Sequence, residues 1–273
     1  MPVYSVTVVV RTGILEEGRA EMTAVITLSA AASEVGQVRQ NNEDAAYSGR
    51  WLYAVADGMG GHAAGEVASA AVIETLRSQD AEVDPGALLE TLSRAVAEAN
   101  AEVARRAAED PARRGMGTTL TAMLCSGDRA ALIHIGDSRA FRLRDGQLRQ
   151  ITEDHVMSKL VSNAGELGEF IVRFLDGRPD RSPDLGLRDL RPGDRYLLCS
   201  DGLSPIVSDP AILEVLAGTT APEAAVRELV ALAEAEGAPD NVSVIVIDVR
   251  EGSGTATAPP VTLGSAAAPA LTR

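Results

Sequence analysis

The sequence predicts an α+β fold with mainly antiparallel sheets. Short apolar runs bounded by turn residues are typical of buried strands, and the four clearest span residues 51–56, 130–135, 195–200 and 242–247. Three helical stretches cover residues 63–77, 87–108 and 222–235. Because strands and helices occur in blocks rather than in strict alternation, we prefer this class over a doubly wound parallel sheet.

The N-terminal half begins with a predicted strand at residues 23–28 and continues into two helices. Residues 63–77 are rich in Ala, Glu and Val and contain little that breaks a helix. After a turn at residues 84–86, residues 87–108 carry apolar side chains at largely helical spacing, with Glu and Arg on the other face. Both helices are therefore expected to pack on a core rather than to bind a ligand.

The C-terminal half adds further strands. Residues 117–124 read as a strand that turns back into the run ending near residue 135. A hairpin of residues 139–144 and 148–152 is expected around Asp145-Gly146, since Asp-Gly is a strong signal for a two-residue turn. The last predicted helix precedes the final strand.

The composition is that of an ordinary globular protein with one large domain. The chain has 273 residues, of which 45% are hydrophobic and 23% charged. Its formal net charge of −14 disfavours nucleic acid or an anionic membrane as a partner. Only Cys125 and Cys199 are present, both within apolar runs. We therefore expect buried, inert thiols and a cytoplasmic location, and no apolar stretch approaches the roughly 20 residues of a membrane-spanning helix.

The folded domain is expected to cover residues 23–250. Residues 1–22 are interpreted as a flexible extension, because charged residues interrupt a short apolar start. Residues 251–273 consist mainly of Gly, Ala, Thr, Ser and Pro. A segment of that composition cannot bury a core, so we expect a disordered tail there.

Four aspartates stand where apolar runs begin or end: Asp57, Asp137, Asp201 and Asp240. If antiparallel neighbours bring these strand ends together, several carboxylates converge on one point. Like charges at short range repel unless a cation neutralises them. Ligands that are all oxygens suit Mg²⁺ or Mn²⁺ better than zinc. The sequence therefore predicts a divalent metal site at one edge of the fold.

Taken alone, each Asp-Gly pair is more often a turn than a metal site. Asp145-Gly146 is interpreted as such a turn. Asp57-Gly58 differs because glycine recurs through Gly65, far more often than a two-residue turn requires. Repeated glycines indicate backbone conformations or close approaches that a Cβ would block, so we interpret this segment as part of a site.

Six short motifs occur in an order that resembles a known family. They are residues 38–44 (VRQNNED), 55–62 (VADGMGGH), 117–119 (GTT), 136–139 (GDSR), 200–202 (SDG) and 240–241 (DN). Together they are similar to those of bacterial metal-dependent (type 2C) serine/threonine protein phosphatases, over residues 33–248. The resemblance implies a β-sandwich of two mainly antiparallel sheets flanked by helices, with a two-metal centre at one edge.

The resemblance also implies which residues would hold two Mn²⁺ or Mg²⁺ ions. Asp57 would bridge both ions. Asp201 and Asp240 would complete the first site, and Glu43 with the carbonyl of Gly58 would complete the second. These residues supply only oxygen ligands, as the pattern of acidic strand ends also suggests.

Further roles follow from the same resemblance. Asp137 with Asp201 would hold a third, weaker ion, and Asp44 would bind a metal-coordinated water from outside the first ligand shell. Arg39 would bind the substrate phosphate, which suits a guanidinium. His62 would be the general acid, whereas the other two histidines are interpreted as structural or solvated.

The implied activity is hydrolysis of phosphoserine and phosphothreonine in proteins. A metal-bridged hydroxide would attack phosphorus while the leaving alkoxide takes a proton from the general acid. The expected partners are phosphorylated proteins, notably a Ser/Thr kinase or its targets, and the expected state is a monomer. Two alternatives stay open at this point: a non-catalytic pseudophosphatase that binds phosphoproteins, and a dedicated phosphatase for a single regulator such as an anti-sigma antagonist.

Overall fold

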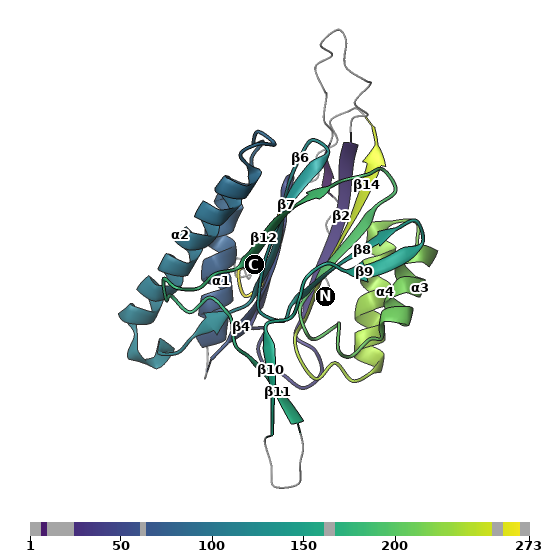
Figure 1. Ribbon diagram of the computed structural model, residues 1–273. Helices are drawn as coiled ribbons and strands as arrows, with labels where there is room; N and C mark the ends of the chain where they lie inside the picture. The colour runs from purple at the N-terminus through teal and green to yellow at the C-terminus, as the bar shows by residue number, and fades with distance from the viewer. Residues whose placement is uncertain (1–6, 10–24, 61–63, 161–166, 253–258, 268–273) are drawn as a thin grey trace, which may run out of the picture.

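The protein consists of four layers, with two antiparallel sheets packed face to face and a pair of helices on each outer face (Figure 1). The computed structural model describes residues 7–9, 25–60, 64–160, 167–252 and 259–267. The expected α+β sandwich of mainly antiparallel sheets flanked by helices is confirmed.

The first sheet has six strands in the order β1-β2-β14-β13-β8-β9. Its central strands are long and buried, and each pairs antiparallel with its neighbours. The bounds are β1 Thr7–Val9, β2 Val25–Glu34, β14 Val242–Glu251, β13 Arg195–Cys199, β8 Arg139–Arg144 and β9 Gln147–Gln150.

The second sheet runs β12-β7-β6-β4-β3-β15, and the short strand β5 pairs with β4 outside that path. A separate hairpin, β10–β11, extends beyond one end of the sandwich (Figure 1). The bounds are β3 Asp44–Ser48, β4 Leu52–Met59, β5 Gly117–Thr118, β6 Leu120–Ser126, β7 Arg129–Ile135, β10 Val156–Leu160, β11 Leu167–Ile171, β12 Asp184–Asp189 and β15 Val261–Gly264.

Helices cover the outer faces of both sheets. The pair α1 (Ala64–Leu76) and α2 (Leu88–Glu109) packs on the second sheet, and the pair α3 (Asp209–Gly218) and α4 (Pro222–Ala235) packs on the first (Figure 1). Short 3₁₀ turns at Arg77–Gln79 and Pro111–Arg113 follow α1 and α2. In the described part of the chain, no helix is both long and apolar enough to cross a membrane.

The alternation of side chains along each central strand builds the three layers of the core. In β13, Tyr196 and Leu198 point into the space between the sheets, whereas Leu197 and Cys199 pack under α3 and α4. Both faces of such a strand are buried, so it appears in the sequence as a continuous apolar run. This double burial fixes the register, because a slip by one residue would exchange the two faces.

Most predicted elements are present with small shifts in their bounds. The three predicted helices correspond to α1, α2 and α4. The hairpin at Asp145-Gly146 is confirmed, and both residues have positive φ, 52° and 72°, as a type I′ turn requires. Helix α3 and strands β3 and β12 were not predicted from the sequence. The edge strand β12 is half exposed and contains a glycine and charged residues, so it lacks an apolar run.

The expected disordered tail is wrong for part of its length. Residues Val261–Gly264 form β15, which pairs with β3, and the Leu263 side chain is buried between the sheets. The average composition of residues 251–273 concealed this short alternating segment. Within the expected N-terminal extension, Thr7–Val9 form β1 and pair with β2. Of the remaining residues of both terminal segments, some lie outside the described residues, and the others lie next to β14 or β15 in the chain.

Candidate metal centre

Aspartates from both sheets meet at one edge of the sandwich. Asp44 opens β3 and lies opposite Asp57 of β4 in the antiparallel register. Besides burial, the negative charges of Asp44, Asp201 and Asp137 help to raise the pKa of Asp57, and the charge of Asp240 helps to raise the pKa of Asp201. The structure thus gathers the acidic residues that the sequence places at strand ends.

The backbone of Asp57 is held by the threonines that follow Gly117. The Asp57 N–H donates to Thr119 Oγ1 over 2.9 Å, and the Asp57 carbonyl accepts from the Thr119 N–H and from Thr118 Oγ1, both at 2.8 Å. Because its backbone is bonded on both sides, Asp57 presents its carboxylate to the acidic edge in a fixed direction. The threonines of the GTT motif thus hold the backbone of Asp57 in place.

Glu43 is placed by bonds to segments far apart in the sequence. Its N–H donates to Asn241 Oδ1 over 2.8 Å, and its carbonyl accepts from the Gly58 N–H over 3.1 Å. A Cβ at Gly58 would lie 2.2 Å from the carbonyl oxygen of Gly65, so only glycine allows α1 to approach β4 this closely. The prediction that these glycines permit a close backbone approach is confirmed at Gly58.

Asp44 is the most enclosed acid of the edge, with 1% of its surface exposed. Its Oδ2 accepts a hydrogen bond from Ser200 Oγ over 2.7 Å, and Ser200 Oγ in turn accepts from the Ser243 N–H over 2.9 Å. Asp44 is therefore tied to the ends of β13 and β14 in the opposite sheet.

Arg39 faces the acids from the outside. Its Nη2 lies 2.6 Å from Asp240 Oδ2 and its Nη1 lies 4.0 Å from Glu43 Oε2. The Arg39 side chain is 47% exposed, so its guanidinium is accessible to an anion that approaches the edge. Among the predicted site residues, Arg39, Glu43 and Asp240 thus lie within reach of one another.

Burial and mutual repulsion raise the pKa values of the aspartates. Burial, followed by the charges of Asp44 and Asp201, raises the pKa of Asp57 well above its usual range. Burial is also the main cause that raises the pKa of Asp44 to about 8 and that of Asp137 to about 7. The pKa of Asp201 is raised by burial as well. A site that opposes its own ionisation in this way requires either protons or cations.

Three carboxylate oxygens at this edge are buried and have no hydrogen-bond partner among the described residues: Oδ1 of Asp44, of Asp137 and of Asp201. A buried acceptor without a donor costs free energy of folding. A hard divalent cation would satisfy carboxylate oxygens of this kind. The residues present therefore fit Mg²⁺ or Mn²⁺. Among the described residues, no three His, Cys, Asp or Glu side chains are already arranged around a common point as metal ligands. At the acidic edge, Asp240 is instead hydrogen-bonded to Arg39.

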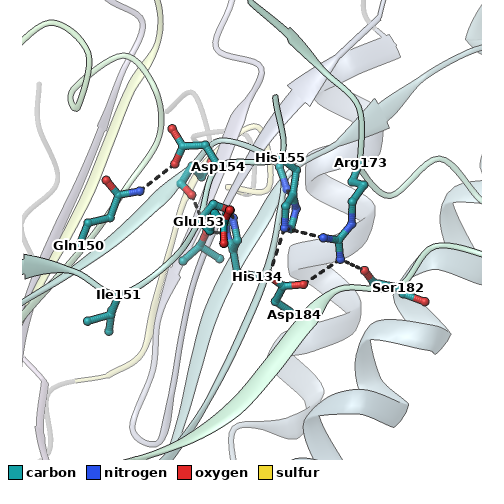
Figure 2. A network of polar contacts seen from close by, with 12 residues as sticks. His134, Gln150, Ile151, Glu153, Asp154, His155, Arg173, Ser182 and Asp184 are labelled. Carbon is teal, nitrogen blue, oxygen red and sulfur yellow. Dashed lines mark hydrogen bonds and ion pairs between the residues drawn. The ribbon is translucent and has the colours of Figure 1, made fainter. Parts of the chain in front are cut away.

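His62 lies outside the described residues, so its role as general acid stays a prediction. The other two histidines are buried. His134 Nδ1 lies 2.9 Å from Thr121 Oγ1, and its Nε2 lies 3.0 Å from the Glu153 carbonyl oxygen. His155 is also bonded to its surroundings through both ring nitrogens (Figure 2). Both histidines are therefore structural rather than solvated, which decides between the two roles that the sequence left open.

Several supporting residues had no role in the sequence analysis. Asn241 donates from Nδ2 to the carbonyls of Val35 and Asn41 and accepts from the Glu43 N–H, so it fixes the chain around the acidic edge. Arg139 binds both carboxylate oxygens of Asp154. The sequence does show polar residues next to the acids, which indicates possible supporting roles. Most of their hydrogen-bond partners lie far away in the sequence and could not be predicted from it.

Comparison with known proteins agrees with this geometry. The family model described as protein phosphatase 2C matches residues 33–241. A relative named serine/threonine protein phosphatase PstP, from Mycobacterium tuberculosis, is 48% identical over 230 residues, which are 81% of this chain and 44% of the relative. The chain thus spans less than half the length of that protein. Protein phosphatase PhpP of Streptococcus pneumoniae is 30% identical over 236 residues, which cover 80% of this chain and 96% of PhpP.

Solved structures show the same similarity. A crystal structure of the M. tuberculosis phosphatase PstP matches with a TM-score of 0.77 and 45% identity, over 83% of this chain and 99% of that one. The PstP catalytic domain in complex with two manganese ions matches with a TM-score of 0.76 and 46% identity, over 83% of this chain and all of that one.

Proposed function

The chain belongs to the protein phosphatase 2C family, and we propose that it hydrolyses phosphoserine and phosphothreonine in proteins in a metal-dependent reaction. The observation that carries the proposal is the set of buried carboxylate oxygens at one edge of the sandwich that have no hydrogen-bond partner in the described ranges. An exposed arginine stands beside them. Oxygens suited to a metal ion and a cation suited to a phosphate therefore occur together.

Two Mn²⁺ or Mg²⁺ ions would be held by Glu43, Asp57, the Gly58 carbonyl, Asp201 and Asp240, with Asp57 shared between them. Asp137 and Asp201 would hold a third, weaker ion. When bound, the ions neutralise the carboxylates and lower the pKa of a coordinated water, which supplies a nucleophile at neutral pH. Asp44 would orient such a water from behind the ligands, since its Oδ1 is buried and accepts from no donor among the residues that the structure describes.

Arg39 binds the substrate phosphate in this proposal. Its planar fork of N–H donors matches two phosphoryl oxygens. The ion pair with Asp240 keeps the guanidinium at the acidic edge, and about half of the side chain is open to solvent. Charge that develops on the phosphoryl oxygens is stabilised by a donor already in place.

His62 would donate the proton that the leaving serine or threonine alkoxide needs. A general acid matters when the departing oxygen is basic and matters little when it departs readily. The His62→Gln variant should therefore slow hydrolysis of a phosphothreonine peptide by about 10²–10⁴-fold and hydrolysis of p-nitrophenyl phosphate far less. Equal losses on both substrates would remove His62 from this role.

The proposed partners are phosphorylated proteins, including a Ser/Thr kinase or the targets of such a kinase. The proposed location is the cytoplasm, where the two buried thiols, Cys125 and Cys199, remain reduced. We further propose that the phosphatase acts as a monomer, because each residue assigned to the site comes from one chain.

The direct test is dephosphorylation of a phosphothreonine peptide with Mn²⁺ or Mg²⁺ and after exhaustive chelation. The proposal expects turnover with either ion, loss of turnover in EDTA and recovery when the ion is restored. Full activity after chelation would contradict the metal-dependent reaction. Binding of the phosphopeptide without turnover in any metal would favour a pseudophosphatase instead.

A further inference from the structure

His155 sits where three parts of the molecule meet. It lies directly before β10, and its side chain is buried. Its neighbours are the turn that carries Asp137, the base of the β10–β11 hairpin and the start of β12 (Figure 2). No catalytic role was assigned to it above.

One side of His155 holds Gly136, the residue before Asp137. The His155 N–H donates to the Gly136 carbonyl over 2.7 Å, and the Gly136 N–H donates to His155 Nδ1 over 3.1 Å. Gly136 has φ of +115°, and a Cβ there would lie 2.5 Å from Thr119 Cγ2. The turn thus depends on a residue of unusual backbone conformation, and His155 bonds both polar groups of that residue.

The other side of His155 holds the hairpin and the edge strand. The His155 carbonyl accepts from the Val172 N–H over 2.8 Å. Because Nδ1 accepts from Gly136, the hydrogen of the neutral ring is on Nε2, which donates to Asp184 Oδ2 over 3.3 Å. Arg173 Nη1 lies 2.8 Å from Nε2, but a guanidinium only donates, so the hydrogen bonds link Arg173 to the ring through Asp184. Arg173 also binds Asp184 Oδ1 over 2.9 Å and the Ser182 carbonyl (Figure 2).

From these contacts we infer that His155 is a positioning residue, which sets the direction of Asp137 according to the position of the β10–β11 hairpin. The chain of contacts runs from Arg173, just after β11, through Asp184 and the imidazole to Gly136 and Asp137. The hairpin extends beyond the sandwich (Figure 1) and carries exposed apolar side chains, Met157 and Phe170, that pair across its strands. A protein substrate that contacts the hairpin thereby affects an acid of the site, and this last step rests on the proposed function.

Two substitutions separate the two sides of the imidazole. His155→Asn places an amide oxygen near the position of Nδ1, so it retains an acceptor for the Gly136 N–H and loses the contacts of Nε2. His155→Gln reaches the position of Nε2 and loses the bond to Gly136. Arg173→Gln removes the guanidinium without touching Gly136. His134→Gln is the matched control, since His134 is a buried histidine whose ring lies 4.8 Å away and which bonds Thr121 and Glu153 instead.

The first measurement is hydrogen–deuterium exchange of the Gly136 amide in the full chain with Mg²⁺, resolved by NMR. We expect about five- to tenfold faster exchange in His155→Gln, the loss of one hydrogen bond, and a smaller acceleration in His155→Asn, which keeps an acceptor for the Gly136 N–H but loses the contacts of Nε2. Arg173→Gln should also accelerate exchange at Gly136, although it does not contact that residue. An unchanged rate in Arg173→Gln, or an equal acceleration in His134→Gln, would overturn the inference.

The second measurement is the kinetic pattern with a phosphothreonine peptide. His155→Gln should lower kcat, because Asp137 is displaced, and His155→Asn should restore kcat while KM rises severalfold, because the hairpin link is broken. Parallel losses of kcat in both variants would show a merely structural histidine. If wild type itself lacks turnover, the proposed function fails, whereas the exchange result still decides the role of His155.

Discussion

Two clusters of buried charge in this protein have opposite chemistry. At the junction of β13 and β14, Asp248 receives bonds at both oxygens from Arg195, over 2.5 and 2.9 Å, and Arg195 Nη1 donates to the Leu216 carbonyl over 2.7 Å. At the acidic edge, Asp137 and Asp201 each keep a buried oxygen that accepts from no donor in the described part of the chain. Compensated charge supports the fold, whereas uncompensated charge indicates a site that completes itself with a ligand.

The largest expected effect concerns the compensated cluster. Asp248→Asn should lower the free energy of unfolding by about 3–5 kcal/mol, because it leaves the Arg195 guanidinium buried without its counter-ion. Urea denaturation measures this loss. Metal-dependent kcat of the folded variant should stay near wild type, and a selective loss of metal dependence would show that the two clusters are not separate.

The next effect concerns the centre of the acidic edge. Asp57→Asn should lower kcat/KM for a phosphopeptide at least about 100-fold, or about 2.7 kcal/mol of transition-state stabilisation. In the proposed centre, this substitution removes the charge that two ions would share. Steady-state kinetics at saturating Mn²⁺ tests this, and near-normal turnover would exclude Asp57 from the metal centre.

A smaller effect is expected at Arg39. Arg39→Lys keeps the positive charge but loses the planar fork, which should weaken phosphate binding by roughly one hydrogen bond, about fivefold. The increase should appear in KM for the phosphopeptide and in Ki for inorganic phosphate. An unchanged Ki for phosphate would remove Arg39 from the binding site.

The last effect is a change in the pH dependence of stability. In metal-free protein the pKa of Asp137 is raised to about 7 from its usual 3.8, mainly by burial. Between these values the folded state binds more protons than the unfolded state, so this group lowers stability as pH rises from about 4 to 7. The stability of Asp137→Asn relative to wild type should therefore increase across that window and then level off. A difference that does not vary with pH would contradict the assigned environment.

The sequence predicted the parts of this structure that have strong local signals. Double burial makes β4, β7, β13 and β14 apolar runs, and the acids at their ends were visible as interruptions. Partners distant in the sequence were not predictable in this way. The bond from Ser200 to Asp44 and that from Glu43 to Asn241 depend on how the two sheets pack. Likewise, β15 is a four-residue strand whose single buried leucine was hidden by its surroundings.

The resemblance supplied what the residues alone did not. Spacing and chemistry indicate an oxygen-rich metal site, but they do not say which carboxylate bridges two ions or that Arg39 faces a phosphate. The structure places Arg39, Glu43 and Asp240 together. The roles of these residues as ligands and phosphate binder remain proposals for the experiments above.

The most direct test of the contrast between the two clusters is the unfolding free energy of wild type and Asp57→Asn, each in EDTA and in saturating Mn²⁺. Mn²⁺ at 100 times its dissociation constant should stabilise wild type by about 2.7 kcal/mol and Asp57→Asn by much less. In EDTA the variant should be at least as stable as wild type, because it removes a buried charge that lacks compensation. A variant that is less stable in EDTA by several kcal/mol, as expected for Asp248→Asn, would show that Asp57 supports the fold and does not serve a metal site.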